Sequence, residues 1–188
     1  MSFSGLIRNI PQIADMDADK EENYIKSFCS LCYDILTHDR YIEMKGYNHH
    51  GDISCHFHSV FVAYITYKTC LFTDCNTAEA TRAALLHDFY LYDWHIVKHD
   101  EYHAFYHPKE ARKNAEKYFG ELTALQTDMI LSHMWPLHLM PPRYKEGMIL
   151  TVADKICAQL DFLKFSEKFR PIYESINKTI RSSDIDYQ

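Results

Sequence analysis

Glycine and proline are scarce in this chain, with 5 and 6 residues among 188. A β-sandwich rich in tight turns, or a long disordered linker, needs more of both, so neither is expected. No apolar run approaches the ~18 residues of a membrane span. The first twenty residues have no basic segment leading into an apolar stretch. No secretory signal is therefore expected, and the predicted location is cytoplasmic.

Clusters of basic residues are also missing. Twenty Lys and Arg stand against 26 Asp and Glu, which gives a formal charge of -6, and the basic residues are scattered. Neither duplex nucleic acid nor a membrane is therefore an expected partner. A small phosphorylated substrate is compatible with this charge, because a metal ion can supply the positive charge that binds phosphate.

The six cysteines carry no sign of export and are expected to be free thiols packed among helices. Cys29 and Cys32 have the spacing of metal ligands. A structural zinc site of that kind needs a second cysteine pair or a histidine pair nearby, and the sequence supplies neither. We favour the simpler interpretation, two small residues on one helix face.

What the chain does have is helical periodicity. With few breakers and 47% hydrophobic residues, it is expected to fold as one all-α domain over residues 1–188, a helical bundle. Asn76 or Thr77 should cap one helix, Pro108 should open another and Gly120 should end it. Helices are predicted over residues 21–37, 55–72, 77–88, 108–119, 122–134 and 144–164. The rest is predicted as loops over 38–54 and 89–106, an N-terminal extension over 1–20, and a C-terminal tail over 166–188 with at most one short helix.

Histidine is over-represented, with 12 residues, and metal binding is one explanation of such a surplus. Three His-Asp pairs occur, at residues 38–39, 87–88 and 99–100. Two of them lie in polar surroundings, where a solvated pair is expected. His87 and Asp88 differ because they end an apolar, alanine-rich segment whose small side chains leave room beside His87. A charge there costs several kcal/mol unless it is paired or bound to a metal.

His58 and Asp154 repeat this pattern on other predicted helices. The helical neighbours of Asp154 at three and four positions are almost wholly apolar, and His58 shares a face with Phe61 and Val62. Each of the two residues, taken alone, has a structural explanation. Asp154 could form a salt bridge or cap a helix, and His58 could be a hydrogen-bonded histidine of the core. Together with His87 and Asp88, however, these side chains can converge inside a bundle, as metal ligands do in such folds.

The order of these residues resembles the HD-domain superfamily of metal-dependent phosphohydrolases. The likeness rests on the pattern H…HD…D, with the first histidine in HSVFVA, the dyad in ALLHD and the last aspartate in VADK. It covers about residues 49–161. The resemblance implies a bundle of the HD type in which one divalent ion is held by His58, His87, Asp88 and Asp154.

Two further histidines resemble the binuclear branch of that superfamily. His107 precedes Pro108, and His133 lies in LSHMWP at a predicted helix C-terminus. In that branch the dyad aspartate bridges two ions, which implies that Asp88, His107 and His133 hold the second. The alternative is structural: His107 caps a helix, and the helix dipole favours His133 at its position.

The resemblance implies a phosphohydrolase that acts on a phosphate ester or anhydride, with a nucleotide as the favoured substrate. Mixed imidazole and carboxylate ligands favour iron or manganese, and cobalt, nickel and zinc also fit. Such an ion lowers the pKa of a bound water to about 7 and so supplies hydroxide at neutral pH. Two alternatives stay open: a regulatory domain that binds a nucleotide or metal without turnover, and a di-iron oxygenase.

Asp93 and Arg143 are further candidate site residues. Many HD hydrolases carry a lysine shortly after the dyad, whereas FYLYDW follows here. Asp93 in that segment is a candidate catalytic acid or base beside Asp88, or else it anchors the loop through backbone hydrogen bonds. Arg143 is a candidate phosphate clamp, or else a surface residue. His103 and His138 receive no assigned role.

Overall fold

Three helices form the centre of the fold. The computed structural model describes residues 18–50, 52–97 and 100–186. The central helices are α4 (Cys55–Leu71), α5 (Thr77–Leu86) and α8 (Lys145–Phe162), and they pack against one another. From Cys55 to Lys68, every residue of α4 except Ile65 is buried. A helix that is apolar all round belongs in the interior, and α4 is that interior helix.

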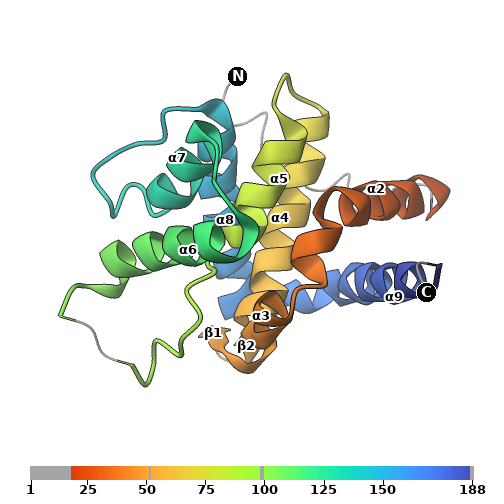
Figure 1. Ribbon diagram of the computed structural model, residues 1–188, viewed down its shortest axis with the longest axis horizontal. Coiled ribbons are helices and arrows are strands. Elements are labelled where there is room, and N and C mark those ends of the chain that lie inside the picture. The colour runs from red at the N-terminus through yellow and green to blue at the C-terminus, as the bar shows by residue number, and fades with distance from the viewer. Residues whose placement is uncertain (1–17, 51, 98–99, 187–188) are drawn as a thin grey trace.

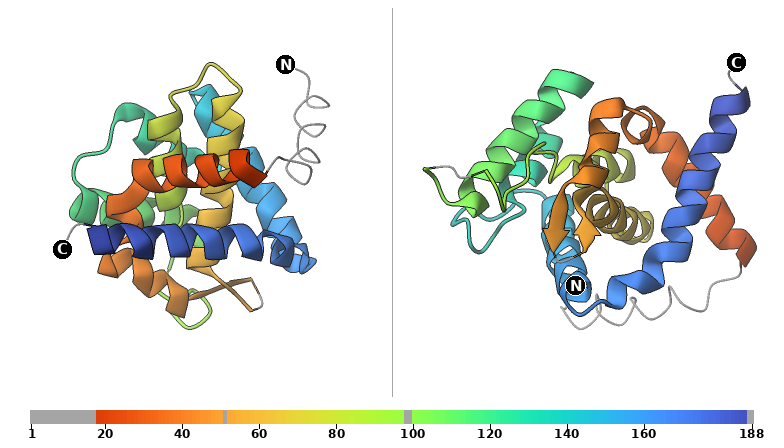
Figure 2. Two further views of the ribbon diagram at one scale, coloured as in Figure 1. Left: turned by 90° about the vertical axis from the view of Figure 1, so that its right-hand side faces the viewer. Right: turned by 90° about the horizontal axis from the view of Figure 1, so that it is seen from below.

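Four helices flank this centre. Figure 1 shows α6 (His103–Phe119) and α7 (Ala124–Ser132) on one side of it, with α2 (Ala18–Leu36) and α9 (Arg170–Asp186) on the other. The two views of Figure 2 agree that α2 and α9 lie side by side. The predicted all-α class is confirmed. None of the described helices combines the length and the apolar character that crossing a bilayer requires.

The predicted helix ends are set by local chemistry. The Asn76 side chain accepts a hydrogen bond from the Glu79 backbone N–H at 3.2 Å, so Asn76 caps α5 as expected. Gly120, with a φ of 87°, ends α6 as expected. Thr123 and Gln126 form a reciprocal capping box that begins α7.

The prediction of a loop over residues 38–54 is wrong in part. This segment contains a short helix α3 (Asp39–Ile42), a 3-10 turn η2 (Glu43–Gly46) and a hairpin of β1 (Asn48–His50) and β2 (Ile53–Ser54). Three buried side chains, Tyr41, Met44 and Ile53, anchor it to the core. The segment looks like a loop because its other residues are mostly polar, and three buried positions are too few to produce a visible period.

The predicted start of α6 at Pro108 is also wrong, because the helix begins five residues earlier at His103. Pro108 therefore lies inside the helix, where it removes one backbone hydrogen bond. The shift matters for function, since it places His107 within a helix and not at its cap. His99, half of the third His-Asp pair, lies outside the described residues, as do residues 1–17 of the N-terminal extension.

The C-terminal segment is more structured than the single short helix expected there. A 3-10 turn η3 (Phe165–Phe169) leads into α9, a helix of 17 residues. Ile176 and Ile180 lie four residues apart and are both buried. This apolar stripe explains why α9 packs against α2.

Candidate metal centre

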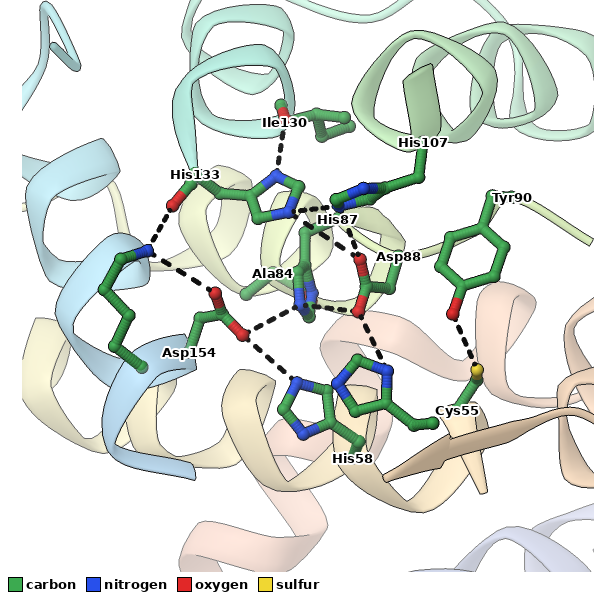
Figure 3. A network of polar contacts seen from close by, with 12 residues as sticks. Cys55, His58, Ala84, His87, Asp88, Tyr90, His107, Ile130, His133 and Asp154 are labelled. Atoms are coloured by element: carbon green, nitrogen blue, oxygen red, sulfur yellow. Dashed lines mark hydrogen bonds and ion pairs between the residues drawn. The ribbon is translucent and has the colours of Figure 1, made fainter. Parts of the chain in front are cut away.

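Six side chains from separate parts of the chain meet inside the bundle. Figure 3 shows them pointing toward one another from within α4, α6 and α8 and from the C-terminal ends of α5 and α7. Each residue is at most 8% exposed. The six are the predicted metal ligands His58, His87, Asp88, His107, His133 and Asp154. The structure thus brings together every ligand that the sequence analysis selected.

Asp154 lies between the first two histidines. Its Oδ1 is 3.2 Å from His58 Nε2 and 3.7 Å from His87 Nε2. One carboxylate oxygen and two imidazole nitrogens therefore converge within reach of a single ion. Imidazole and carboxylate are a common ligand pair for first-row transition metals.

Asp88 lies between two groups of imidazoles. Its Oδ2 is 3.5 Å from His87 Nε2, whereas its Oδ1 is 3.3 Å from His107 Nε2 and 3.7 Å from His133 Nε2. The two oxygens of one carboxylate thus face opposite sides of the cluster. This is the arrangement that a carboxylate bridging two ions would need.

Three of the histidines are held in one tautomer by the backbone. Nδ1 lies 2.7–2.8 Å from a carbonyl oxygen in each case, that of Ala84 for His87, of His103 for His107 and of Ile130 for His133. A carbonyl only accepts, so Nδ1 carries the proton and, in a neutral ring, the lone pair is on Nε2. Metal-bound histidines are oriented by such contacts.

The resulting lone pairs need a cation. His107 Nε2 and His133 Nε2 lie 2.9 Å apart, and the buried His87 Nε2 has no hydrogen-bond partner. Two nitrogen ligands about 2.1 Å from one ion and about 90° apart would be separated by about 3.0 Å. The donor set therefore fits a bound divalent ion.

The electrostatics point the same way. Burial opposes ionisation of Asp88 and Asp154, but nearby histidines outweigh it and hold both pKa values well below the usual range. These histidines are His87 and His107 for Asp88, and His58 and His87 for Asp154. Burial also opposes protonation of His58, yet Asp154 and Asp161 outweigh it and raise the His58 pKa to about 10. The centre is thus a buried anionic site that attracts positive charge.

Asp161 is a residue that the sequence analysis missed. Its Oδ2 lies 2.7 Å from His58 Nδ1, and both side chains are fully buried. Asp161 therefore orients His58, as backbone carbonyls orient the other three histidines, and adds a negative charge. Its position was detectable, because Asp161 follows Asp154 by seven residues and so lies two turns along the same face of α8.

His49 is a second missed residue. It lies in β1, its Nδ1 is 3.7 Å from Asp88 Oδ2, and its ring is 3.9 Å from the His58 ring between centroids. His49, His58 and Asp88 also lie close enough together to share an ion. Nothing in the sequence indicates this, since the hairpin that delivers His49 was not predicted.

Lys155 lies at the edge of the centre. Its Nζ donates to the His133 carbonyl at 2.9 Å and lies 3.8 Å from Asp154 Oδ2, while 39% of the side chain is exposed. A lysine of α8 thus lies beside the centre.

The other candidate site residues lie elsewhere. Asp93 Oδ1 accepts a hydrogen bond from the His95 backbone N–H at 2.9 Å, which is the loop-anchoring alternative. Arg143 is a surface residue, with 77% of its side chain exposed, and it borders a groove of about 640 Å³ between α6 and α7. His138 lines the same groove, which none of the six clustered residues lines. His103 stacks between Trp94 and His107.

The cysteines are free and take no part in the centre. Cys29 and Cys32 are both buried in α2, as the simpler interpretation predicted. Burial raises the pKa of Cys29 to about 12 and that of Cys32 further. Metal binding requires the thiolate, so this pair is a poor ligand.

Comparison with known proteins gives no match, whether with protein-family models, with curated proteins or with solved structures.

Proposed function

We propose that this chain is a metal-dependent phosphohydrolase of the HD-domain type, which cleaves a phosphate ester or anhydride of a nucleotide. One observation supports the proposal above the others: Asp88 presents its two oxygens to two groups of imidazoles at 3.3–3.7 Å. A pair of divalent ions held by a shared carboxylate is a common device for hydrolysing phosphates.

The ligands divide into two sets in this proposal. His58, His87, Asp88 and Asp154 would hold one ion, and Asp88, His107 and His133 the other. Iron or manganese suits these nitrogen and oxygen donors, with cobalt, nickel or zinc also compatible. When bound, the ions supply Lewis acidity toward phosphate oxygens and a water whose pKa is near 7.

Lys155 is the proposed phosphate-contacting residue of the chain itself. Its ammonium group lies beside Asp154 and is partly open to solvent. A phosphate seated there would find a fixed positive charge without displacing any of the six clustered side chains. A cation aimed at developing negative charge typically contributes about 10²–10³-fold to the rate.

The test combines metal analysis with a panel of phosphorylated substrates on purified, untagged protein. We expect about one to two iron or manganese ions per chain and hydrolysis of at least one phosphate compound. Lys155→Gln should keep the metal and lose about 10²-fold in kcat/KM. Asp39→Ala, which removes the exposed carboxylate of another His-Asp pair, is the matched control and should change neither property.

The same experiment separates the alternatives. Bound metal without hydrolysis across the panel would favour the regulatory domain. Consumption of dioxygen by the iron-loaded protein would favour the oxygenase. No metal after anaerobic purification and addition of Mn²⁺ or Fe²⁺ would overturn all three.

A further inference from the structure

A second groove lies away from the candidate metal centre, between η2 and α9. The left view of Figure 2 shows α9 running alongside the segment that holds α3 and η2. The groove has a volume of about 410 Å³. Four cationic side chains and a single carboxylate, that of Glu174, line it. The four cations are Lys45, Arg170, Lys178 and Arg181. In a chain with a formal charge of -6, this is a marked local excess of positive charge.

Nearby carboxylates balance only part of this charge: Glu174 lines the groove, and the pKa of Glu22 is lowered by Lys26 and, to a smaller extent, by the positive charge of Lys178. Arg170 forms an ion pair with Glu167 at 2.6 Å. Among the described residues, no ion pair involves Lys45, Lys178 or Arg181. Burial lowers the pKa of Lys45, and the nearby positive charge of Arg181 lowers it further. Lys45 and Arg181 thus line the same groove close enough for their like charges to act on each other.

The floor of the groove is polar and tied to the central helix. Tyr173 lines the groove, and its hydroxyl lies 2.9 Å from Nδ1 of the buried His56 on α4. Asn177, one turn further along α9, donates one amide N–H to the Tyr173 carbonyl at 2.7 Å, which leaves its second N–H for an anion. A bound ligand would therefore meet hydrogen-bonding groups at the floor and cations at the rim.

We propose that this groove binds a small multivalent anion of the pyrophosphate or triphosphate class, at a site separate from the metal centre. Lysine and arginine side chains bind phosphate oxygens with charge-assisted hydrogen bonds. The volume is near the lower end of the ~300–1,000 Å³ typical of ligand pockets, which suits a phosphate chain better than a folded partner. The proposal does not depend on the function proposed for the metal centre.

The groove is placed to influence that centre. His56 precedes His58 by two residues on α4, so the Tyr173 contact reaches the helix that carries a candidate ligand. On the other side, η2 leads directly into β1, where His49 lies 3.7 Å from Asp88. An anion that draws η2 and α9 together would act on both connections.

Equilibrium dialysis of the full chain as purified, with radiolabelled pyrophosphate at about 0.1 M salt, tests the proposal. The groove variant combines Lys45→Gln with Arg181→Gln. The matched control combines Arg112→Gln with Lys113→Gln, which removes the same charge from α6, where both cations are paired with glutamates. All four side chains lie at the surface or partly so, and thermal melts of both variants check that the fold is retained.

We expect the groove variant to lose one bound pyrophosphate per chain, or to bind it at least about 10-fold more weakly, and the control to stay within about 2-fold of the wild type. Pyrophosphate held at the metal centre would remain in both variants and so cancels from the comparison. Equal binding by the two variants, or no saturable binding by the wild type, would overturn the proposal. Binding of a polyglutamate peptide but not of pyrophosphate would also overturn it, in favour of an acidic protein partner.

Discussion

His107 Nε2 and His133 Nε2 lie 2.9 Å apart in the interior of the bundle, and Nδ1 of each ring already donates to a backbone carbonyl. Two neutral rings in this tautomer direct lone pairs at each other, which is unfavourable unless a proton or a metal ion lies between them. Burial and the neighbouring His107 lower the pKa of His133 to about 3. A proton on His133 is thus disfavoured at neutral pH, whereas a bound metal ion would satisfy both lone pairs.

This pair predicts how metal content responds to mutation. His107→Ala and His133→Ala should each leave about one metal per chain, because the first ligand set stays intact. Asp88→Ala should leave none, since Asp88 belongs to both sets. Elemental analysis measures the content, with Asp39→Ala as the control for the dyad. If Asp88→Ala retained both metals, Asp88 would not be a ligand.

Asp161→Asn tests the role of the carboxylate behind His58. Asparagine keeps an acceptor for His58 Nδ1 but removes the charge, so metal affinity should fall by about 10–100-fold. Glu146→Gln is the matched control, because Glu146 is also buried on α8 but accepts its hydrogen bond from the Asn76 backbone N–H. Competition with a chromophoric chelator measures the affinity. An equal fall in both variants would mean that Asp161 has only a structural role.

His56 predicts a loss of stability in acid. Burial, with the nearby charge of Lys45, lowers its pKa to about 3, against about 6.5 in an unfolded chain. A histidine whose pKa is lowered by folding makes its full contribution to stability above pH ~6.5, and this contribution is lost as the pH falls toward 3. Between about pH 7.5 and pH 5 this amounts to about 2 kcal/mol. Urea unfolding should show a weaker pH dependence for His56→Gln, and equal slopes would contradict the assignment.

Gly147→Ala should destabilise the start of α8. A Cβ at this position would lie 2.8 Å from Pro142 Cβ, and the proline ring cannot move aside easily. The expected cost is about 1–3 kcal/mol of unfolding free energy. Gly46→Ala is the control, because a Cβ there meets nothing within 4 Å. The midpoints of urea unfolding measure both, and equal midpoints would contradict the prediction.

Much of the architecture is predictable from local pattern. The sequence predicted α2, α4, α5, α7 and α8 to within a few residues, because each carries an apolar period and a cap or breaker near its ends. The start of α6 was wrong because its first residues are aromatic and polar, without an apolar stripe. The length of α9 was missed because the segment is mostly polar, although Ile172, Ile176 and Ile180 recur at helical spacing.

The candidate ligands were predictable for a related reason. His58 and Asp154 are polar residues on apolar helix faces, and a polar group in such a place needs a partner. That argument selects residues but not distances. It could not say that Asp88 would direct its two oxygens to different imidazoles, since this depends on how α5, α6 and α7 cross.

By itself, then, the sequence determined the helical class, most of the helices and the identity of the six clustered residues. The class, the helices and the choice of His58, His87, Asp88 and Asp154 depend on the spacing of apolar and polar residues within about two turns of helix. His107 and His133, in contrast, were selected by the resemblance to the binuclear branch of the HD-domain superfamily. Only the tertiary structure decided that His49 lies beside Asp88, that Lys155 reaches the His133 carbonyl and that Asp161 contacts His58. It also decided that η2 and α9 enclose a cationic groove. Such contacts join residues far apart in the chain, and they follow from the packing of whole elements, which local spacing does not encode.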